Sequence, residues 1–124
     1  MSKHVLIAED NLINQSVAKA FVTKLGYQVS IAANGLEAVE KFIELKPDLI
    51  LMDCNMLEMD GMEATRKIRQ LEEENGYSRL PIVALTAHAF SEIVEECRAA
   101  GMDDHLAKPI IFNKLREVLA EQLG

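Results

Sequence analysis

The sequence has no tryptophan, only two cysteines and three prolines, and no long apolar run. Cys54 and Cys97 are too few for the disulfide framework of a small secreted protein, and no Cys-x-x-Cys or His-x-x-x-His spacing indicates a zinc site. We therefore expect two reduced thiols. A membrane-spanning helix needs roughly 20 consecutive apolar residues, and residues 1–4 carry no signal-peptide pattern. These absences predict a cytoplasmic domain without membrane contact.

Positive charge is also scarce. The 124 residues contain 13 Lys and Arg against 20 Asp and Glu, which gives a net charge of −7, and the basic residues form no block. Attraction to nucleic-acid phosphates or anionic lipids is therefore not expected to drive binding, whereas a cation or a basic partner surface suits the chain. The length fits a single domain, 1–124, and no output domain is recognisable after the last expected helix.

The hydrophobic period alternates five times between short β-rich runs and longer helical stretches. Strands are expected over 4–8, 27–31, 48–52, 81–85 and 105–107, and helices over 12–25, from 35 to before Pro47, over 61–75, over 90–100 and from 110 onward. Strands separated by helices imply a parallel sheet with helices on both faces. We predict an α/β fold of the flavodoxin-like (βα)5 type with strand order 2-1-3-4-5. The acidic run 72–74 is expected to be a solvated helix face.

Polar side chains follow four of the expected strands at the point where each strand ends. They are Glu9, Asp10, Asp53, Thr86 and Lys108. Ligands and chemistry collect beyond the carboxyl ends of parallel strands, and strands one and three are neighbours at the switch point of this topology. We therefore expect acids, a hydroxyl and an amine to face one crevice.

Three carboxylates crowded into that crevice repel one another. Two unit charges about 4 Å apart at an effective dielectric near 20 interact by roughly 4 kcal/mol. A divalent cation would relieve this repulsion. Oxygen ligands favour a hard ion, and a site with few direct protein ligands suits Mg²⁺, which keeps several waters. The simpler interpretation is that the carboxylates spread into solvent.

Seven short segments together carry a resemblance to one family. They are Glu9-Asp10-Asn11, Asn34-Gly35, Leu51-Met52-Asp53, Met59-Asp60-Gly61, Leu85-Thr86-Ala87, Gly101-Met102-Asp103-Asp104 and Lys108-Pro109. In this order and at these spacings, the chain resembles the receiver domains of bacterial two-component response regulators over nearly its whole length. Each segment alone is a weak signal, and the set is a specific one.

The resemblance implies that Asp53 accepts a phosphoryl group from a phosphohistidine, with Mg²⁺ as the cofactor. Asp10 and Asp53 are expected to bind Mg²⁺ directly, and Glu9 to act through water or to support the site. The backbone carbonyl of Asn55 is the remaining protein ligand that the resemblance implies. A carboxylate nucleophile suits this chemistry, because phosphoryl transfer mainly requires positioning and cations around the phosphoryl oxygens.

The resemblance also implies roles for the hydroxyl of Thr86 and the amine of Lys108. Lys108 is expected to hold one phosphoryl oxygen as a point charge, and Thr86 to donate a hydrogen bond to another. Family members often have a cis peptide bond at the position of Pro109. The domain is then a phosphoacceptor that signals, not an enzyme beyond self-catalysed phosphotransfer and autodephosphorylation.

Four positions vary within the family that the chain resembles. Asn55 and His88 match positions that tune the hydrolysis of the aspartyl phosphate. His105 stands where receivers usually carry the aromatic residue that turns inward on activation, in the switch surface around helix four, strand five and helix five. Leu57 replaces a proline of many relatives, which suggests a looser loop after the acceptor.

The segments 9–15 and 52–56 resemble those of receivers attached to hybrid sensor histidine kinases and phosphorelays. The implied partner is a histidine kinase or a histidine phosphotransfer protein that docks near helix one and the loop after strand five. The residues expected there are Asn11, Ile13, Asn14, Pro109, Ile110 and Phe112. The sequence leaves open the oligomeric state and whether the domain stands alone or belongs to a larger kinase.

Two other classes of protein share parts of this pattern. A haloacid-dehalogenase-like phosphatase also forms an aspartyl phosphate, but its general acid lies two residues after the nucleophile, where this chain has Asn55. A flavodoxin-like module would bind flavin in the same topology. The acidic loop after strand one is poorly suited to a flavin phosphate.

Overall fold

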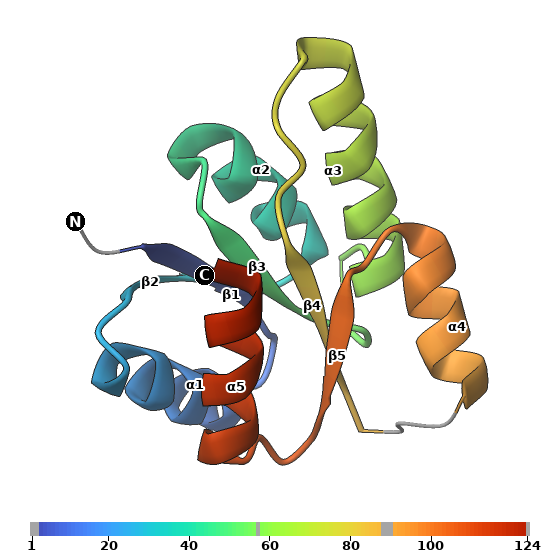
Figure 1. Cartoon of the computed structure of the whole chain (residues 1–124). Coiled ribbons are helices and arrows are strands. Elements are labelled where there is room, and N and C mark those ends of the chain that lie inside the picture. Colours follow the sequence, from blue (N-terminus) through green and yellow to red (C-terminus); the bar gives the residue numbers. More distant parts are fainter. Residues whose placement is uncertain (1–2, 57, 88–90, 124) are drawn as a thin grey trace.

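A computed structural model describes residues 3–56, 58–87 and 91–123, and within these ranges five strands alternate with five helices (Figure 1). The strands are β1 (His4–Ala8), β2 (Gln28–Ala32), β3 (Leu49–Asp53), β4 (Ile82–Thr86) and β5 (Asp104–Ala107). The helices are α1 (Leu12–Lys24), α2 (Gly35–Leu45), α3 (Gly61–Asn75), α4 (Ser91–Ala100) and α5 (Phe112–Leu123). The predicted alternation of strands and helices is confirmed. No helix of the described chain is both long and apolar enough to cross a bilayer.

The sheet has the order β2-β1-β3-β4-β5, and every pairing is parallel. This confirms the predicted flavodoxin-like topology. Parallel neighbours require a crossover connection, and each crossover here is a helix. The register pairs Ala8 with Met52, Asp53 with Leu85 and Thr86 with Ala107. The last residues of these strands therefore lie along one edge of the sheet.

Both faces of the sheet are covered by helices, which explains why the central strands are apolar throughout (Figure 1). On one face, side chains of α2, α3 and α4 pack with Leu6, Ile50 and Ile82. On the other face, α1 and α5 pack with alternate residues of the same strands, such as Ile7 and Leu51. β3 and β4 are buried along their whole length.

Three helices begin at residues whose side chains accept a hydrogen bond from the first helical turn. Asn11, Asn34 and Asp60 cap α1, α2 and α3 in this way, which satisfies an otherwise unpaired backbone N–H. α5 begins at Phe112, two residues later than predicted. The expected start of the fourth helix, at residue 90, lies outside the described residues.

The cysteines are free and buried, which confirms the expected reduced thiols. The sulfur atoms of Cys54, after β3, and Cys97, on α4, are 3.1 Å apart. Burial raises the pKa of the Cys54 thiol, and the hydrogen bond with Cys97 raises it further. Both residues therefore act as small core side chains between the sheet and α4.

The prediction of a solvated acidic face over 72–74 is wrong for Glu72, which is only 6% exposed. The helical period places residue 72 one turn after the buried Ile68, on the inward face of α3. The Glu72 carboxylate accepts hydrogen bonds from Nη1 of Arg69 at 2.8 Å and from the backbone N–H of Leu80 at 2.7 Å. Glu73 and Glu74 are exposed, as predicted.

Candidate functional site

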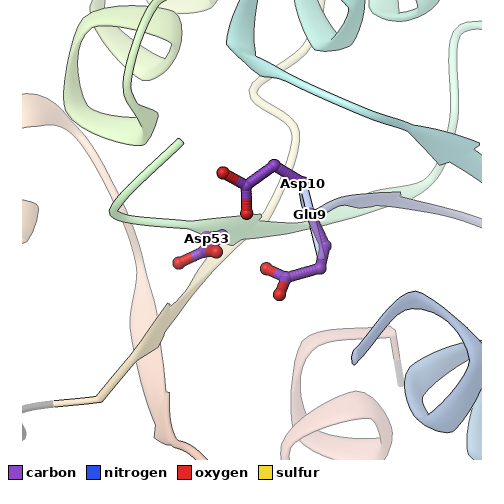
Figure 2. A group of neighbouring side chains, drawn as sticks. All are labelled: Glu9, Asp10 and Asp53. Atoms are coloured by element: carbon purple, nitrogen blue, oxygen red, sulfur yellow. The ribbon is translucent and has the colours of Figure 1, made fainter. Parts of the chain in front are cut away.

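Three carboxylates meet at the carboxyl ends of the two neighbouring strands β1 and β3. Glu9 and Asp10 follow β1 directly, and Asp53 is the last residue of β3. Each of them offers a carboxylate oxygen within 4.8 Å of the others, and the three side chains converge in Figure 2. Glu9 and Asp53 are almost completely buried, at 1% and 2% exposed, whereas Asp10 is exposed. The three acids that follow β1 and β3 therefore lie together, as the strand ends predicted.

The backbone on both sides of the cluster is held by the sheet. Glu9 continues the pairing of β1 with β2 by donating its N–H to the carbonyl of Ala32 at 3.0 Å. Cys54 donates in the same way to the carbonyl of Leu85 at 3.0 Å. A Cβ atom on Gly61 would lie 2.1 Å from the carbonyl oxygen of Asp53. Only glycine therefore allows α3 to begin this close to the end of β3.

Lys108 brings a positive charge into the cluster from the loop after β5. Its Nζ lies 2.7 Å from Oδ2 of Asp53 and 3.2 Å from Oε2 of Glu9. Its backbone N–H donates to the carbonyl of Thr86 at 2.8 Å. The peptide bond between Lys108 and Pro109 is cis, as the resemblance implied.

Burial and the neighbouring charges together set the pKa values of Glu9 and Lys108. It raises the pKa of Glu9 from 4.5 to about 7, and the hydrogen bond to Asp53 and the charge of Asp53 act in the same direction. The contacts with Asn14 and Lys108 oppose this rise. Burial by itself would lower the pKa of Lys108, but its hydrogen bond to Asp53 and the charges of both acids raise it overall. The ammonium is therefore charged at neutral pH.

The donor set fits a hard divalent cation. When ionised, three carboxylates and one ammonium leave a net charge of −2 in a mostly buried space. Among the residues that the structure describes, the group that could hold a metal ion supplies carboxylate oxygens only. Hard oxygen donors of this kind favour Mg²⁺ or Ca²⁺ over transition metals.

A family model for the response regulator receiver domain matches residues 5–120. The chain belongs to this family. The match reaches from β1 into α5 and includes the acid cluster, so the receiver resemblance of the sequence is confirmed. The haloacid-dehalogenase-like and flavodoxin-like alternatives receive no support from the comparisons.

Relatives of this receiver domain include hybrid kinases and solved receivers. The chain is 37% identical over 147 residues to "Probable histidine kinase 1" of Oryza sativa subsp. indica, with 96% of the chain covered. It spans only 15% of the length of that relative. The receiver domain of a sensor histidine kinase from Pseudomonas aeruginosa PAO1, solved with magnesium in its active-site cleft, is 41% identical. Its TM-score is 0.90, and 100% of this chain and 99% of that chain are covered.

A second solved structure contains a receiver bound to a partner. It is the Saccharomyces cerevisiae complex of the histidine phosphotransfer signalling protein Ypd1 with the receiver domain of its downstream response regulator Ssk1. This match has 34% identity and a TM-score of 0.92, and it covers 98% of this chain and 88% of that chain.

The remaining predicted site residues lie around the cluster at different depths. Thr86 is the last residue of β4 and is buried. Asn55 is exposed and donates its backbone N–H to Oδ1 of Asp53 at 3.2 Å. His105 lies half-buried on the edge strand β5, beside a hollow that Ile111 and Lys114 also line. His88 and Leu57 lie outside the described residues.

Most of the predicted docking residues of the receiver domain surround one side of the cluster. Asn11, Ile13 and Pro109 are exposed, and Ile13 reaches 74%. Phe112 is half-buried, because its ring packs edge-on against Phe21 at 5.4 Å between centroids. The half-buried Ile110 lines a hollow of about 60 Å³ that reaches the acid cluster.

Two exposed apolar residues on this side were not among the predicted docking residues, and one predicted docking residue makes a contact that the sequence did not suggest. Leu12 and Ile111 are 75% and 61% exposed. Asn14 was predicted at the docking surface, and its half-buried side chain donates a hydrogen bond to Oε1 of Glu9 at 2.7 Å. The contact between Asn14 and Glu9 depends on the burial of Glu9, which the sequence alone does not show.

The variant Glu9→Gln is expected to stabilise the metal-free domain near pH 8 and to change it little near pH 5. The raised pKa of Glu9, about 7 against 4.5, means that the fold favours the protonated acid. Protonated Glu9 therefore stabilises the folded domain fully at a pH below its ordinary pKa of 4.5, and this stabilisation is lost as the pH rises through the folded-state pKa of about 7. Glutamine stays neutral and loses nothing. The shift corresponds to at most roughly 3 kcal/mol, and the lost Lys108 contact reduces the gain.

Urea denaturation in EDTA at the two pH values measures this effect. Glu40→Gln, a matched change on the exposed side of α2, serves as the control. Parallel pH profiles for Glu9→Gln and the wild type would contradict the prediction.

Proposed function

We propose that this receiver domain takes a phosphoryl group from a phosphohistidine onto the carboxylate of Asp53. The observation that carries the proposal is the position of Asp53 at the end of β3, where an ammonium lies 2.7 Å away and two further carboxylates lie beside it. An acceptor needs cations around the phosphoryl oxygens, and a cluster of acids can hold a metal ion that supplies them. The family match supports the same function.

The transfer uses one oxygen of the Asp53 carboxylate as the nucleophile. A phosphorus–oxygen bond forms to this oxygen while the phosphorus–nitrogen bond of the phosphohistidine breaks, and the leaving imidazole nitrogen takes up a proton. The product is an acyl phosphate on the protein. Lys108 is placed to hold one phosphoryl oxygen, and Thr86, at the end of the adjacent strand β4, to donate a hydrogen bond to another.

Asp10 and Asp53 are proposed to bind Mg²⁺ directly, with Glu9 acting through water and the carbonyl of Asn55 as a further ligand. When bound, Mg²⁺ supplies positive charge to the phosphoryl oxygens. The related Pseudomonas aeruginosa receiver was solved with magnesium in its active-site cleft. The protein's own part is to hold the acids in one place, and the buried ends of β1 and β3 do this.

The variant Asp10→Ala is expected to weaken Mg²⁺ binding by roughly 10-fold or more. Removing a residue that only hydrogen-bonds to a metal ligand already lowers metal affinity by about this factor, and removing the ligand itself should lower the affinity at least as much. NMR titration of the backbone amides with MgCl2 measures the dissociation constant for both proteins. Asp48→Ala, at the opposite end of β3, removes an equal charge far from the cluster and provides the control. Equal affinities for Asp10→Ala and the wild type would remove Asp10 from the metal site.

The proposed phosphoryl donor is a histidine kinase or a histidine phosphotransfer protein, as for the Ssk1 receiver in its complex with Ypd1. Exposed apolar side chains beside the cluster, including Leu12, Ile13 and Ile111, form a surface that a partner helix can cover. Asn11, Pro109, Ile110 and Phe112 complete the proposed docking side. With such a donor, we propose that residues 1–124 act as one receiver in the cytoplasm.

The decisive experiment offers the domain a phosphorylated histidine phosphotransfer protein and then a small phosphoramidate donor, each with Mg²⁺. A mass gain of one phosphoryl group that is acid-stable and base-labile, as an acyl phosphate is, supports the function. No gain from either donor would reject it.

His105 is proposed to be the switch side chain on β5, and Asn55 and His88 to tune the hydrolysis of the acyl phosphate. His105 borders a hollow of about 230 Å³ that Ile111 and Lys114 also line, so its side chain has space to move on that side. We expect its imidazole NMR signals to shift when beryllofluoride and Mg²⁺ mimic phosphorylation. The signals of His4, at the far end of β1, should stay in place. Unchanged His105 signals would assign it to a static surface position.

A further inference from the structure

The side chain of Asn14 points into the proposed acceptor site. It is half-buried on the first turn of α1, and its Nδ2 donates to Oε1 of Glu9 at 2.7 Å. This contact is shorter than those of the Lys108 ammonium with the same carboxylate, which are 3.2 and 3.4 Å. The amide is therefore the closest of these donors to a carboxylate that is almost fully buried.

The start of α1 is folded so that Asn14 has little freedom to leave. The side-chain oxygen of Asn11 accepts a hydrogen bond from the backbone N–H of Asn14 at 3.0 Å. The backbone carbonyl of Asn11 accepts one from the backbone N–H of Gln15 at 2.9 Å. Gln15 then donates its side-chain Nε2 to the backbone carbonyl of Glu9 at 2.6 Å. Two consecutive amide side chains thus tie the first turn of α1 to both the backbone and the carboxylate of Glu9.

Glu9 and Asp53 compete for the same ammonium. Nζ of Lys108 lies 2.7 Å from Asp53 and 3.2 Å from Glu9. A buried carboxylate that loses a hydrogen-bond donor draws more strongly on those that remain. Without the amide of Asn14, Glu9 would draw Lys108 away from the acceptor and would itself move from its place beside Asp10.

We propose that Asn14 is a positioning residue of the phosphoacceptor site: its amide fixes the carboxylate of Glu9 beside Asp10 and leaves Lys108 directed at Asp53. The proposal rests on the proposed function and deepens it. Groups that orient a metal-binding carboxylate are part of the metal site, although they never touch the ion. Asn14 therefore sets the affinity for Mg²⁺ and the rate at which Asp53 is phosphorylated.

The test compares Asn14→Ala and Asn14→Leu with the wild type. Leucine keeps nearly the shape of asparagine without the donor. Ser16→Ala, an exposed change on the same helix, is the control. We expect both Asn14 variants to bind Mg²⁺ about 10-fold more weakly by NMR titration and to react more slowly with phosphoramidate at saturating Mg²⁺. Ser16→Ala should behave as the wild type does, and all melting temperatures should remain close together.

A double-mutant cycle with Glu9→Ala separates positioning from a general structural effect. Asn14→Ala should lose its effect on Mg²⁺ affinity once Glu9 is absent, because the contact no longer exists. An equal effect in both backgrounds would overturn the proposal. Wild-type Mg²⁺ affinity and phosphoramidate rate in both variants, with slower transfer only from a phosphotransfer protein, would also overturn it and return Asn14 to the docking surface. A wild-type domain that neither binds Mg²⁺ nor reacts would reject the proposed function itself.

Discussion

The variant Asp53→Asn is expected to take up no phosphoryl group from phosphoramidate or acetyl phosphate in the presence of Mg²⁺, whereas the wild type takes up one. The side-chain amide has nearly the shape of the carboxylate but is a poor nucleophile. The surrounding strand is buried and paired on both sides, so the substitution leaves the fold intact. Intact-mass spectrometry under non-acidic and acidic conditions measures the uptake, and circular dichroism checks the fold.

Two further variants make this result specific. Glu40→Gln changes the charge equally on the exposed side of α2 and should be phosphorylated as the wild type is. Lys108→Met should be phosphorylated more slowly without losing the acceptor, because the ammonium 2.7 Å from Asp53 is proposed to assist the transfer and not to receive the group. A full phosphoryl gain by Asp53→Asn would place the acceptor on another carboxylate.

The strand ends were predictable because parallel strands constrain them strongly. An apolar run of about five residues locates each buried strand, and parallel pairing brings the carboxyl ends to one edge. Glu9, Asp10 and Asp53 could therefore be brought together from the sequence alone, and their carboxylates do converge. Lys108 follows a shorter run, yet the same argument located it correctly beside Asp53.

The direction of individual side chains on helices was less predictable. Asn14 lies one turn after the cap Asn11, a position from which a side chain can face either a partner or the end of β1. Its actual contact depends on how deeply Glu9 is buried, which is a property of the assembled fold. The sequence did not single out Leu12 and Ile111, which are exposed because they lie in the first turn of α1 and just before α5.

Glu72 illustrates a different limit. Its spacing from Ile68 and from Arg69 was visible in the sequence and favoured an inward position with an ion pair. The run of three glutamates favoured a solvated face instead. The partners that make burial of the Glu72 carboxylate possible, the backbone of Leu80 and the arginine bound to Asp103, come together only through the order of the strands. Leu80 and Asp103 lie outside α3, so the burial of the Glu72 carboxylate could not be predicted from the neighbouring residues.

The variant Arg69→Met is expected to destabilise the domain by about 3–5 kcal/mol, because it leaves a buried carboxylate without its charge partner. Arg69 donates to Glu72, to Asp103, and to the backbone carbonyls of Gly101 and Leu80, all at 2.8–2.9 Å. These contacts join α3 to the chain segments that enter β4 and β5. Removing the guanidinium thus affects three elements at once.

Thermal denaturation should place the Arg69→Met transition roughly 10–20 °C below that of the wild type. Arg66→Met, an exposed arginine on the same helix, should shift it little. The double variant Arg69→Met with Glu72→Leu should recover part of the loss, since no unpaired charge is then buried. A melting temperature close to that of Arg66→Met would show that the network around Glu72 contributes little. Recovery in the double variant would identify the uncompensated carboxylate, not the missing packing of Arg69, as the main cause of the destabilisation.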